Sequence, residues 1–172
     1  SMRLNADYCA VTVSGKDKGQ LNEGDVMVVD LHNNAITDGK PSAETALHTQ
    51  IYRRYPDIGA VLHTHSIAST VLTMHYPNSD SLILKGYELL KAMDGTQTHD
   101  TELAIRIFDN TQDIDALAQA VDNDMASDRI HYAYLIRGHG LYTWARDMAT
   151  CFRQLEALEV LLAVELERRK IG

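Results

Sequence analysis

Two histidines one residue apart, His63 and His65, are the most informative chemical feature of the sequence. They close the apolar run Gly59–His65, which predicts a buried strand. Side chains at positions i and i+2 of a strand point to the same side, so the two imidazoles should project together. Neutral imidazole is a common zinc ligand, but two ligands do not complete a catalytic site. The pair therefore predicts part of a metal centre.

The third candidate ligand is His139, within the run Arg137–Gly140. The flanking glycines permit a tight turn and would expose the imidazole at the end of a strand. A catalytic zinc typically takes three protein ligands and leaves one position open. On pattern alone, surface histidines on a strand explain the pair equally well, so both interpretations stay open at this point.

The elements that must position these side chains alternate along the chain. Runs rich in β-branched residues predict strands at Tyr8–Val13, Asp25–Leu31, Gly59–His65, Leu103–Phe108, His131–Arg137 and Leu141–Trp144. Helical spacing and caps predict helices at Ala43–Arg54 (with Ser42 as N-cap), Ser66–His75, Tyr87–Met93, Asp113–Met125 and Arg146–Arg169. The alternation predicts an α/β domain with helices covering a sheet, and it leaves the strand order open.

Composition excludes several classes of function. The 172 residues suit one domain, and the net charge of −8 offers no basic field for nucleic acid or an anionic membrane. No signal peptide or membrane-spanning run is recognisable. Cys9 and Cys151 lie far apart in apolar segments, which predicts reduced, buried thiols in a cytoplasmic protein.

Several motifs together resemble the class II aldolase/adducin family. Ala60–Ser66, which follows Tyr52–Gly59, resembles the metal-binding strand of that family. Lys40–Thr45 resembles the segment before it, and Arg137–Gly140 resembles the segment with the third histidine. The order and spacing of the motifs fit over nearly the whole chain.

This resemblance implies a three-layer α/β/α sandwich with a central, mainly antiparallel sheet. It implies that His63, His65 and His139 hold one Zn²⁺ per subunit, although such a site also accepts Co²⁺, Mn²⁺ or Fe²⁺. It further implies a homotetramer with sites at subunit interfaces. The apolar stripe of the last predicted helix is compatible with that assembly and equally with a monomer.

Within the family, Val13–Gly19, Lys85–Lys91 and Ile107–Ile114 are most similar to the branch that dehydrates 5-methylthioribulose 1-phosphate in methionine salvage. The implied product is 2,3-diketo-5-methylthiopentyl 1-phosphate. The resemblance places Glu88 first as the acid/base group and Glu44 second. A glutamate on a short helix and a glutamate in the first turn of a helix are the ordinary interpretations of these two residues.

The substrate phosphate is expected at Ser14 and Gly15, with Lys16 or Lys18 and Ser42 nearby. A Ser-Gly turn offers N–H donors, and a helix N-terminus is a natural anion site. Members of the family usually carry a further N-terminal helix and a Gly-Asn phosphate loop before the segment where this chain begins. Part of the phosphate grip is therefore expected to be missing from these 172 residues.

Two other functions fit the same sequence. The first is a sugar-phosphate aldolase or epimerase of the family, which would keep the three histidines and use a different acid/base group. The second is a non-catalytic, adducin-like binding module, which can dispense with the metal ligands. Bound metal and retro-aldol assays separate these alternatives.

Overall fold

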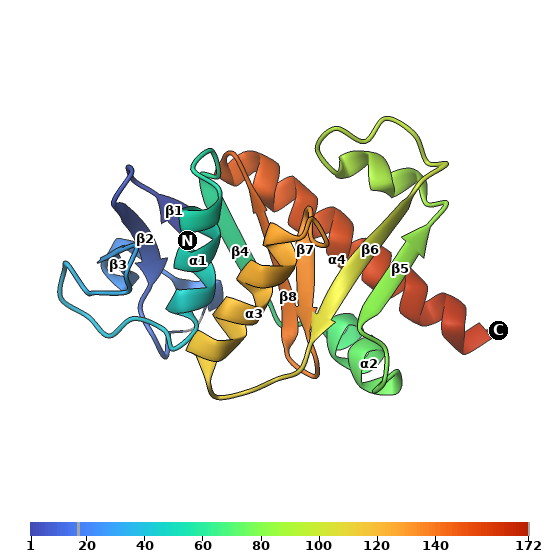
Figure 1. Ribbon diagram of the computed structural model, residues 1–172, viewed down its shortest axis with the longest axis horizontal. Helices are drawn as coiled ribbons and strands as arrows, with labels where there is room; N and C mark the ends of the chain where they lie inside the picture. Colours follow the sequence, from blue (N-terminus) through green and yellow to red (C-terminus); the bar gives the residue numbers. More distant parts are fainter. Residues whose placement is uncertain (17, 172) are drawn as a thin grey trace.

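A single mixed sheet organises the computed structural model, which describes residues 1–16 and 18–171. The strand order is β3-β2-β1-β4-β8-β7-β6-β5 (Figure 1). In the described part of the chain, every neighbouring pair is antiparallel except β6 with β7, so the expected mainly antiparallel sheet is confirmed. The strands are β1 (Met2–Arg3), β2 (Tyr8–Thr12), β3 (Val26–Asp30), β4 (Ala60–Thr64), β5 (Ser81–Lys85), β6 (Glu102–Phe108), β7 (Ala133–Ile136) and β8 (Gly140–Ala145).

Two strands, β1 and β5, are not predicted from the sequence. The two residues of β1 form a strand because Met2 pairs with Ala10 of β2 on one side and with Ala60 of β4 on the other. Strand β5 alternates between buried Leu82 and Leu84 and more exposed neighbours. Ile83 is its one β-branched residue and it has no aromatic residue, so its strand signal is weak.

The helices cover both faces of the sheet. The α-helices are α1 (Thr45–Arg54), α2 (Ile67–His75), α3 (Ile114–Ala126) and α4 (Met148–Ile171), and the 3-10 helices are η1 (Lys18–Gln20), η2 (Glu23–Asp25) and η3 (Glu88–Ala92). Ser66 caps α2 as predicted, since its hydroxyl accepts from the Ser69 N–H at 3.1 Å. Ser42 does not cap α1. Its side chain accepts from the Glu44 N–H and its carbonyl accepts from Thr45, so it forms a turn before the helix.

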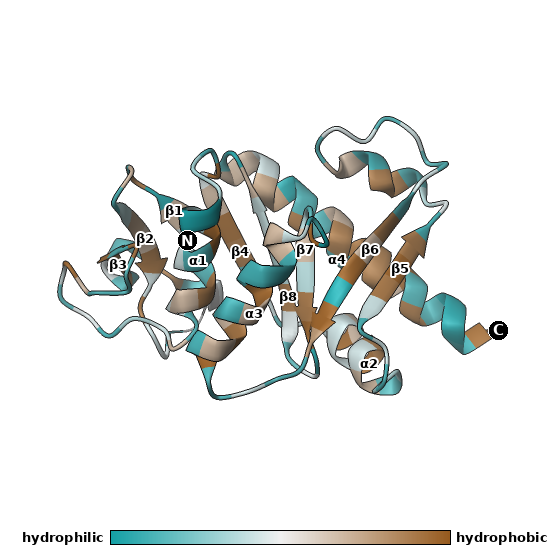
Figure 2. Ribbon diagram, in the orientation of Figure 1, coloured by the Kyte–Doolittle hydropathy of each residue, from teal (hydrophilic) through white to brown (hydrophobic). Residues whose placement is uncertain are grey.

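Period-two alternation in the central strands gives the fold its three layers. On β7, Tyr134 and Ile136 pack against the residues of α1 and α3, whereas Ala133 and Leu135 pack against α2 and α4. Figure 1 shows α1 and α3 in front of the sheet and α4 behind it. In Figure 2 β4 is mostly brown, whereas β7 and β8 have paler stretches. All residues of β7 and β8 are buried, as expected for strands covered on both faces. The expected α/β/α sandwich is confirmed.

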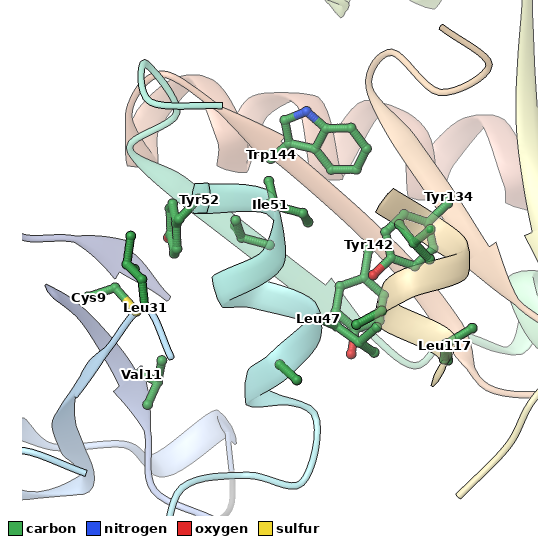
Figure 3. Packing of buried hydrophobic residues seen from close by; sticks show 14 of the residues in the cluster. Cys9, Val11, Leu31, Leu47, Ile51, Tyr52, Leu117, Tyr134, Tyr142 and Trp144 are labelled. Carbon is green, nitrogen blue, oxygen red and sulfur yellow. The ribbon is translucent and has the colours of Figure 1, made fainter. Parts of the chain in front are cut away.

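A buried aromatic stack runs through the layer between the sheet and α1 (Figure 3). The rings of Tyr134 and Tyr142 stack with centroids 4.9 Å apart, and Trp144 is tilted against Tyr134 at 6.1 Å. The stack is completed by His63, whose ring lies 4.0 Å from that of Tyr142. Rigid aromatic packing of this kind holds a polar ring in one orientation.

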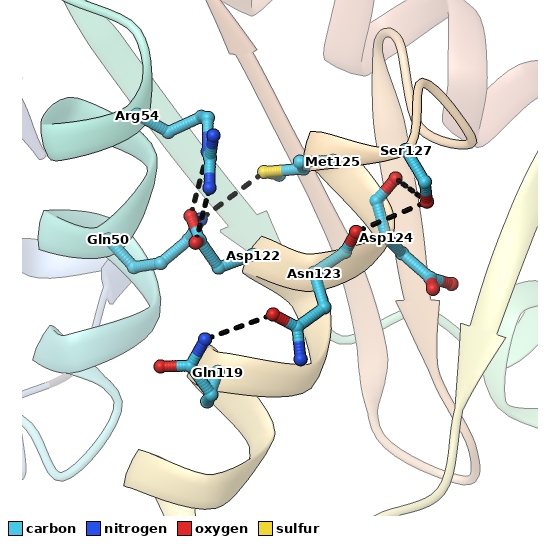
Figure 4. A network of polar contacts seen from close by, with 8 residues as sticks. All are labelled: Gln50, Arg54, Gln119, Asp122, Asn123, Asp124, Met125 and Ser127. Atoms are coloured by element: carbon cyan, nitrogen blue, oxygen red, sulfur yellow. Dashed lines mark hydrogen bonds and ion pairs between the residues drawn. The ribbon is translucent and has the colours of Figure 1, made fainter.

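Helix α1 is held against α3 by a polar clamp (Figure 4). Asp122 accepts from Arg54 Nε at 2.9 Å and from Gln50 Nε2 at 2.8 Å, and a second Arg54 nitrogen completes a forked ion pair. Such bidentate pairs are geometrically specific. Because Glu44 directly precedes α1, the clamp also fixes the direction from which that carboxylate approaches the sheet.

Cys9 and Cys151 are free and buried, as predicted. Burial raises the pKa of each thiol to about 11, so both are protonated and unreactive at neutral pH. Among the described residues, no helix has the length and apolar character needed to cross a membrane.

Candidate metal centre

The three predicted histidines meet at one end of the sheet. His63 lies in β4 and His65 directly follows it, and β4 pairs with the start of β8. The turn between β7 and β8 carries His139 to the same place. The Nε2 atom of His65 is 2.8 Å from that of His63 and 2.9 Å from that of His139. The predicted projection of His63 and His65 into one space is confirmed.

The glycines around His139 allow this close approach. A Cβ atom on Gly140 would lie 2.0 Å from the carbonyl oxygen of Thr64 and 3.0 Å from the imidazole of His63. Gly138 has a φ of +62°, a backbone conformation that residues other than glycine rarely adopt. Both glycines therefore have a geometric reason for their place beside His139.

His63 is oriented by two contacts that the sequence analysis does not identify. Its Nδ1 lies 2.9 Å from the carbonyl oxygen of Leu141, which only accepts hydrogen bonds, so Nδ1 carries the proton. Its ring is stacked on Tyr142 with an interplanar angle of 18°. The lone pair of Nε2 is thereby directed at the other histidines, as in metal sites whose ligands are fixed by an outer hydrogen bond. The tyrosines within the predicted strands His131–Arg137 and Leu141–Trp144 are the sequence feature that could have indicated this stacking.

A carboxylate completes the cluster. The Oε1 atom of Glu44 is 2.8 Å from His139 Nε2, and its Oε2 atom is 3.7 Å from His63 Nε2. One ligand atom from each of the four residues lies within 4.8 Å of the others. Three imidazole nitrogens and one carboxylate oxygen are a donor set that suits zinc and related divalent ions. Glu44, His63, His65 and His139 could therefore hold a metal ion.

The electrostatics of the cluster favour neutral ligands. Burial is the main cause that lowers the pKa of His63 to about 3, and the neighbouring His65 and His139 act in the same direction. Burial also lowers the pKa of His139, although Glu44 opposes it. Metal ions bind the unprotonated imidazole. The fold thus holds His63 ready for a metal at any pH at which the protein is handled.

Acidification should destabilise the metal-free protein. Below about pH 6.5 the unfolded chain protonates His63, whereas the folded chain keeps it neutral to about pH 3. The unfolded state then binds more protons, so the free energy of unfolding falls as the pH falls. We expect the urea midpoint of metal-free protein to drop between about pH 7 and 4, and to drop less in His63→Gln. Equal pH dependence in the two proteins would contradict the burial of a neutral His63.

One of the expected phosphate residues, Ser42, lines a cavity beside the histidines. Ser42 lines this cavity of about 220 Å³ together with Glu44 and His63. Ser14 is nearby, because its N–H donates to the Lys40 carbonyl at 3.0 Å. Gly15 follows with a φ of +77°. The structure thus brings Ser42 next to the cluster and Ser14 next to the segment that leads to it.

Lys16 and Lys18, the lysines expected near the phosphate, follow Ser14 and Gly15 in the sequence. Lys16 forms an ion pair with Asp25 at 2.8 Å, and its side chain is half exposed. Its ammonium group therefore already has a carboxylate partner, which a substrate phosphate would have to replace or share. The side chain of Lys18 lies outside the described residues.

Glu88 lies at the opposite end of the sheet from the histidines. Because β6 runs parallel to β7, the start of β6 at Glu102 is at the end away from the turn with His139. Strand β5 ends beside Glu102, and η3 with Glu88 follows at once. The seven residues of β6 span about 20 Å. In Figure 1 the segment between β5 and β6 is at the top, whereas the β7–β8 turn is at the bottom. Within one chain, Glu88 does not reach the cluster.

Comparison with protein families decides how the chain is related to known proteins. The family described as Class II Aldolase and Adducin N-terminal domain matches residues 1–166. The chain belongs to the class II aldolase and adducin family. The resemblance inferred from Lys40–Thr45, Ala60–Ser66 and Arg137–Gly140 is thereby confirmed.

Close relatives within this family carry one name. The chain is 62% identical over 171 residues to methylthioribulose-1-phosphate dehydratase of Alcanivorax borkumensis, covering 99% of this chain and 81% of the relative. It is 54% identical over 172 residues to the protein of the same name from Marinobacter nauticus, covering 99% of this chain and 83% of the relative. The inferred similarity to the dehydratase branch of the class II aldolase and adducin family is confirmed.

Solved structures support the fold of this family member. An L-fuculose 1-phosphate aldolase superposes with a TM-score of 0.76 over 96% of this chain and 72% of the other, at 24% identity. L-fuculose-1-phosphate aldolase from Thermus thermophilus gives a TM-score of 0.71 over 93% of this chain and 78% of the other, at 22% identity. At such identities the likeness establishes the shared fold alone.

Proposed function

We propose that this chain is a zinc-dependent dehydratase of methionine salvage. The reaction removes water from 5-methylthioribulose 1-phosphate and gives 2,3-diketo-5-methylthiopentyl 1-phosphate. The observation that carries the proposal is an intact cluster of His63, His65, His139 and Glu44 in a chain 62% identical to a relative with that named activity. A binding module has no need of such a cluster. The buried free thiols support a cytoplasmic location.

The elimination requires two proton movements on adjacent carbons. The C3 proton beside the C2 carbonyl is removed, and the C4 hydroxyl leaves as water after it gains a proton. The resulting C3 enol becomes the 3-ketone when its hydroxyl loses a proton and C4 gains one. When bound, the ion supplies a Lewis acid that polarises substrate oxygens. The three histidines hold it, and the stack of Tyr142 on His63 keeps one of these ligands in place. A carboxylate positioned over C3 and C4 accounts for both proton movements.

Glu88 is our first choice for this carboxylate, and it acts in a neighbouring subunit. Its side chain is 70% exposed, and its nearest partners are Lys91 and His99. The Lys91 hydrogen bond is the main cause that lowers the pKa of Glu88, so the group is ready to act first as a base. An exposed acid/base group remote from its own histidines is what an active site shared between subunits requires.

The assembly we propose is a homotetramer with its sites at subunit interfaces. Helix α2 follows the metal-binding strand and exposes apolar side chains at helical spacing. Ile67 is 80% exposed, Val71 41% and Met74 62%. Side chains of this kind on one helix face favour contact with another chain. Their position at the histidine end of the sheet is the right one for an interface that brings Glu88 from a second subunit.

Glu44 is our second choice for the acid/base role. It is already within 2.8 Å of His139, so it needs no second subunit. In our proposal the substrate phosphate binds beside it, at Ser14, Gly15, Lys16 and Ser42. Ser42 carries most of this assignment because it lines the same cavity as Glu44 and His63.

The reaction itself is tested with substrate. Zinc-loaded protein is incubated with 5-methylthioribulose 1-phosphate, and the 2,3-diketone is measured by mass. A parallel assay with ketose 1-phosphates measures retro-aldol cleavage. We expect diketone formation that a chelator abolishes. Retro-aldol products without diketone would establish an aldolase instead, and metal-free protein with neither activity would favour the binding module.

A further inference from the structure

A buried carboxylate on α4, beside the segment that follows β5, has no part in the function described so far. Glu165 lies near the C-terminus of α4, and its side chain is 1% exposed. Buried carboxylates are costly unless several donors surround them. An unused buried charge of this kind calls for an explanation.

Four hydrogen bonds from described residues surround this carboxylate. Tyr87 Oη donates to Oε2 at 2.6 Å. Arg168 donates to the two oxygens at 3.0 and 2.7 Å, and Arg169 Nε donates to Oε1 at 2.6 Å. Burial raises the pKa of Glu165, but the bonds from Arg168, Tyr87 and Arg169 outweigh it and lower the pKa to about 2. The group is therefore charged in any assay near neutral pH.

The bond to Tyr87 is the one among these four that leaves α4. Arg168 and Arg169 are three and four residues from Glu165 on the same helix. Tyr87, by contrast, is 78 residues away in the sequence and occupies the N-cap position of η3. The residue after Tyr87 is Glu88. The carboxylate on α4 is thus joined by one tyrosine to the backbone that carries the proposed acid/base group.

The segment with Glu88 needs such an anchor. It follows Gly86, which has a φ of +74° and no side chain to pack. In the part of the chain that the structure describes, no side chain caps η3, and both Glu88 and Leu89 are exposed. Leu90 is buried and fixes the later part of the segment. Tyr87 is therefore the contact that determines where the chain enters η3.

We propose that Glu165 is a positioning residue that fixes Glu88 through the hydroxyl of Tyr87. Arg168 and Arg169 orient the Glu165 carboxylate, and Tyr87 transfers that orientation to the start of η3. The inference rests on the proposed function, because it gives Glu88 an acid/base role. Misplacement of a reacting group by a fraction of an ångström to one ångström is enough to lower kcat.

The test begins with Tyr87→Phe, which removes one hydroxyl and keeps the partly buried ring. Tyr55→Phe is the matched control, since Tyr55 is a half-buried tyrosine on the opposite face of the sheet. We expect Tyr87→Phe to lower kcat about tenfold with KM and bound metal unchanged, and Tyr55→Phe to leave kcat unaltered. Glu165→Gln should act in the same direction as Tyr87→Phe.

A double-mutant cycle with Glu88→Gln separates positioning from general damage. If Tyr87 acts through Glu88, adding Tyr87→Phe to Glu88→Gln lowers kcat no further. An additional loss of about tenfold in the double variant, or full activity in Tyr87→Phe, would overturn the inference. Inactive wild-type protein would instead count against the proposed function, and a fully active Glu88→Gln variant would count against the acid/base role proposed for Glu88.

Amide hydrogen exchange gives a readout that needs no activity. We expect faster exchange of the amides of 87–92 in Tyr87→Phe, and wild-type rates there in Tyr55→Phe. Unchanged exchange in Tyr87→Phe would show that its hydroxyl does not fix the segment, whatever reaction the protein catalyses.

Discussion

Replacement of His63 by alanine is expected to abolish stoichiometric metal binding and to lower dehydratase activity on the order of a thousandfold or more. Loss of an outer hydrogen bond to a metal ligand already costs about 10- to 100-fold, and this change removes a ligand itself. His63 also carries the contacts to Leu141 and Tyr142 that orient the cluster. Metal per chain, measured by elemental analysis beside the activity assay, checks the prediction.

His32→Ala is the appropriate control, because His32 is an exposed histidine outside the cluster. It should bind about one metal ion per chain, as the wild type should. Retention of that metal in His63→Ala would contradict the assignment of the cluster. A thermal melt of both variants distinguishes loss of metal from loss of fold.

Glu88→Gln is expected to lower kcat by about 10²- to 10⁴-fold while the bound metal stays unchanged. The amide keeps the size of the side chain and cannot move the proton. The metal is unaffected because Glu88 lies at the opposite end of the sheet from His63, His65 and His139 of its own chain. Kinetics and metal content on the same preparation check both parts. Equal kcat values for variant and wild type would leave Glu44 as the acid/base group.

Mixed assemblies test whether Glu88 acts across subunits. Coexpressed His63→Ala and Glu88→Gln chains, each inactive alone, should recover about one quarter of the wild-type activity in equal, random mixtures. One half of the subunits then offers intact histidines, and the other half offers an intact Glu88. The matched control pairs His63→Ala with Glu44→Gln. These two changes affect the same cluster, so no mixed site is repaired. Recovery in the control, or none in the first mixture, would contradict a shared site.

The metal cluster is predictable from the sequence because its determinants are local. His63 and His65 share one face of a strand by their spacing alone, and the glycines beside His139 indicate a turn. Runs rich in β-branched residues likewise predict the strands β2, β3, β4, β6, β7 and β8. The extent of β4 and α2 is close to the prediction for the same reason, since each is bounded by residues with a strong local preference.

What the sequence could not predict depends on pairing between distant segments. The Leu141 carbonyl that orients His63 is 78 residues away in the chain. Strand β1 exists only because β2 and β4 flank it. Glu88 is recognisable by resemblance, but its separation from the histidines follows from the parallel pairing of β6 with β7, which no local pattern reveals. Serine is a preferred N-cap residue, but Ser42 instead accepts a hydrogen bond from Glu44 in the turn before α1.

The aromatic stack beneath the cluster also makes the protein its own optical probe. The chain contains one tryptophan, Trp144, which is buried and tilted against Tyr134. Through Tyr134 and Tyr142 it is in continuous ring contact with His63. Its intrinsic fluorescence therefore arises from a single position linked to the candidate metal centre. A metal titration can be followed in the unlabelled wild-type protein by exciting Trp144 selectively, at a wavelength that the tyrosines do not absorb.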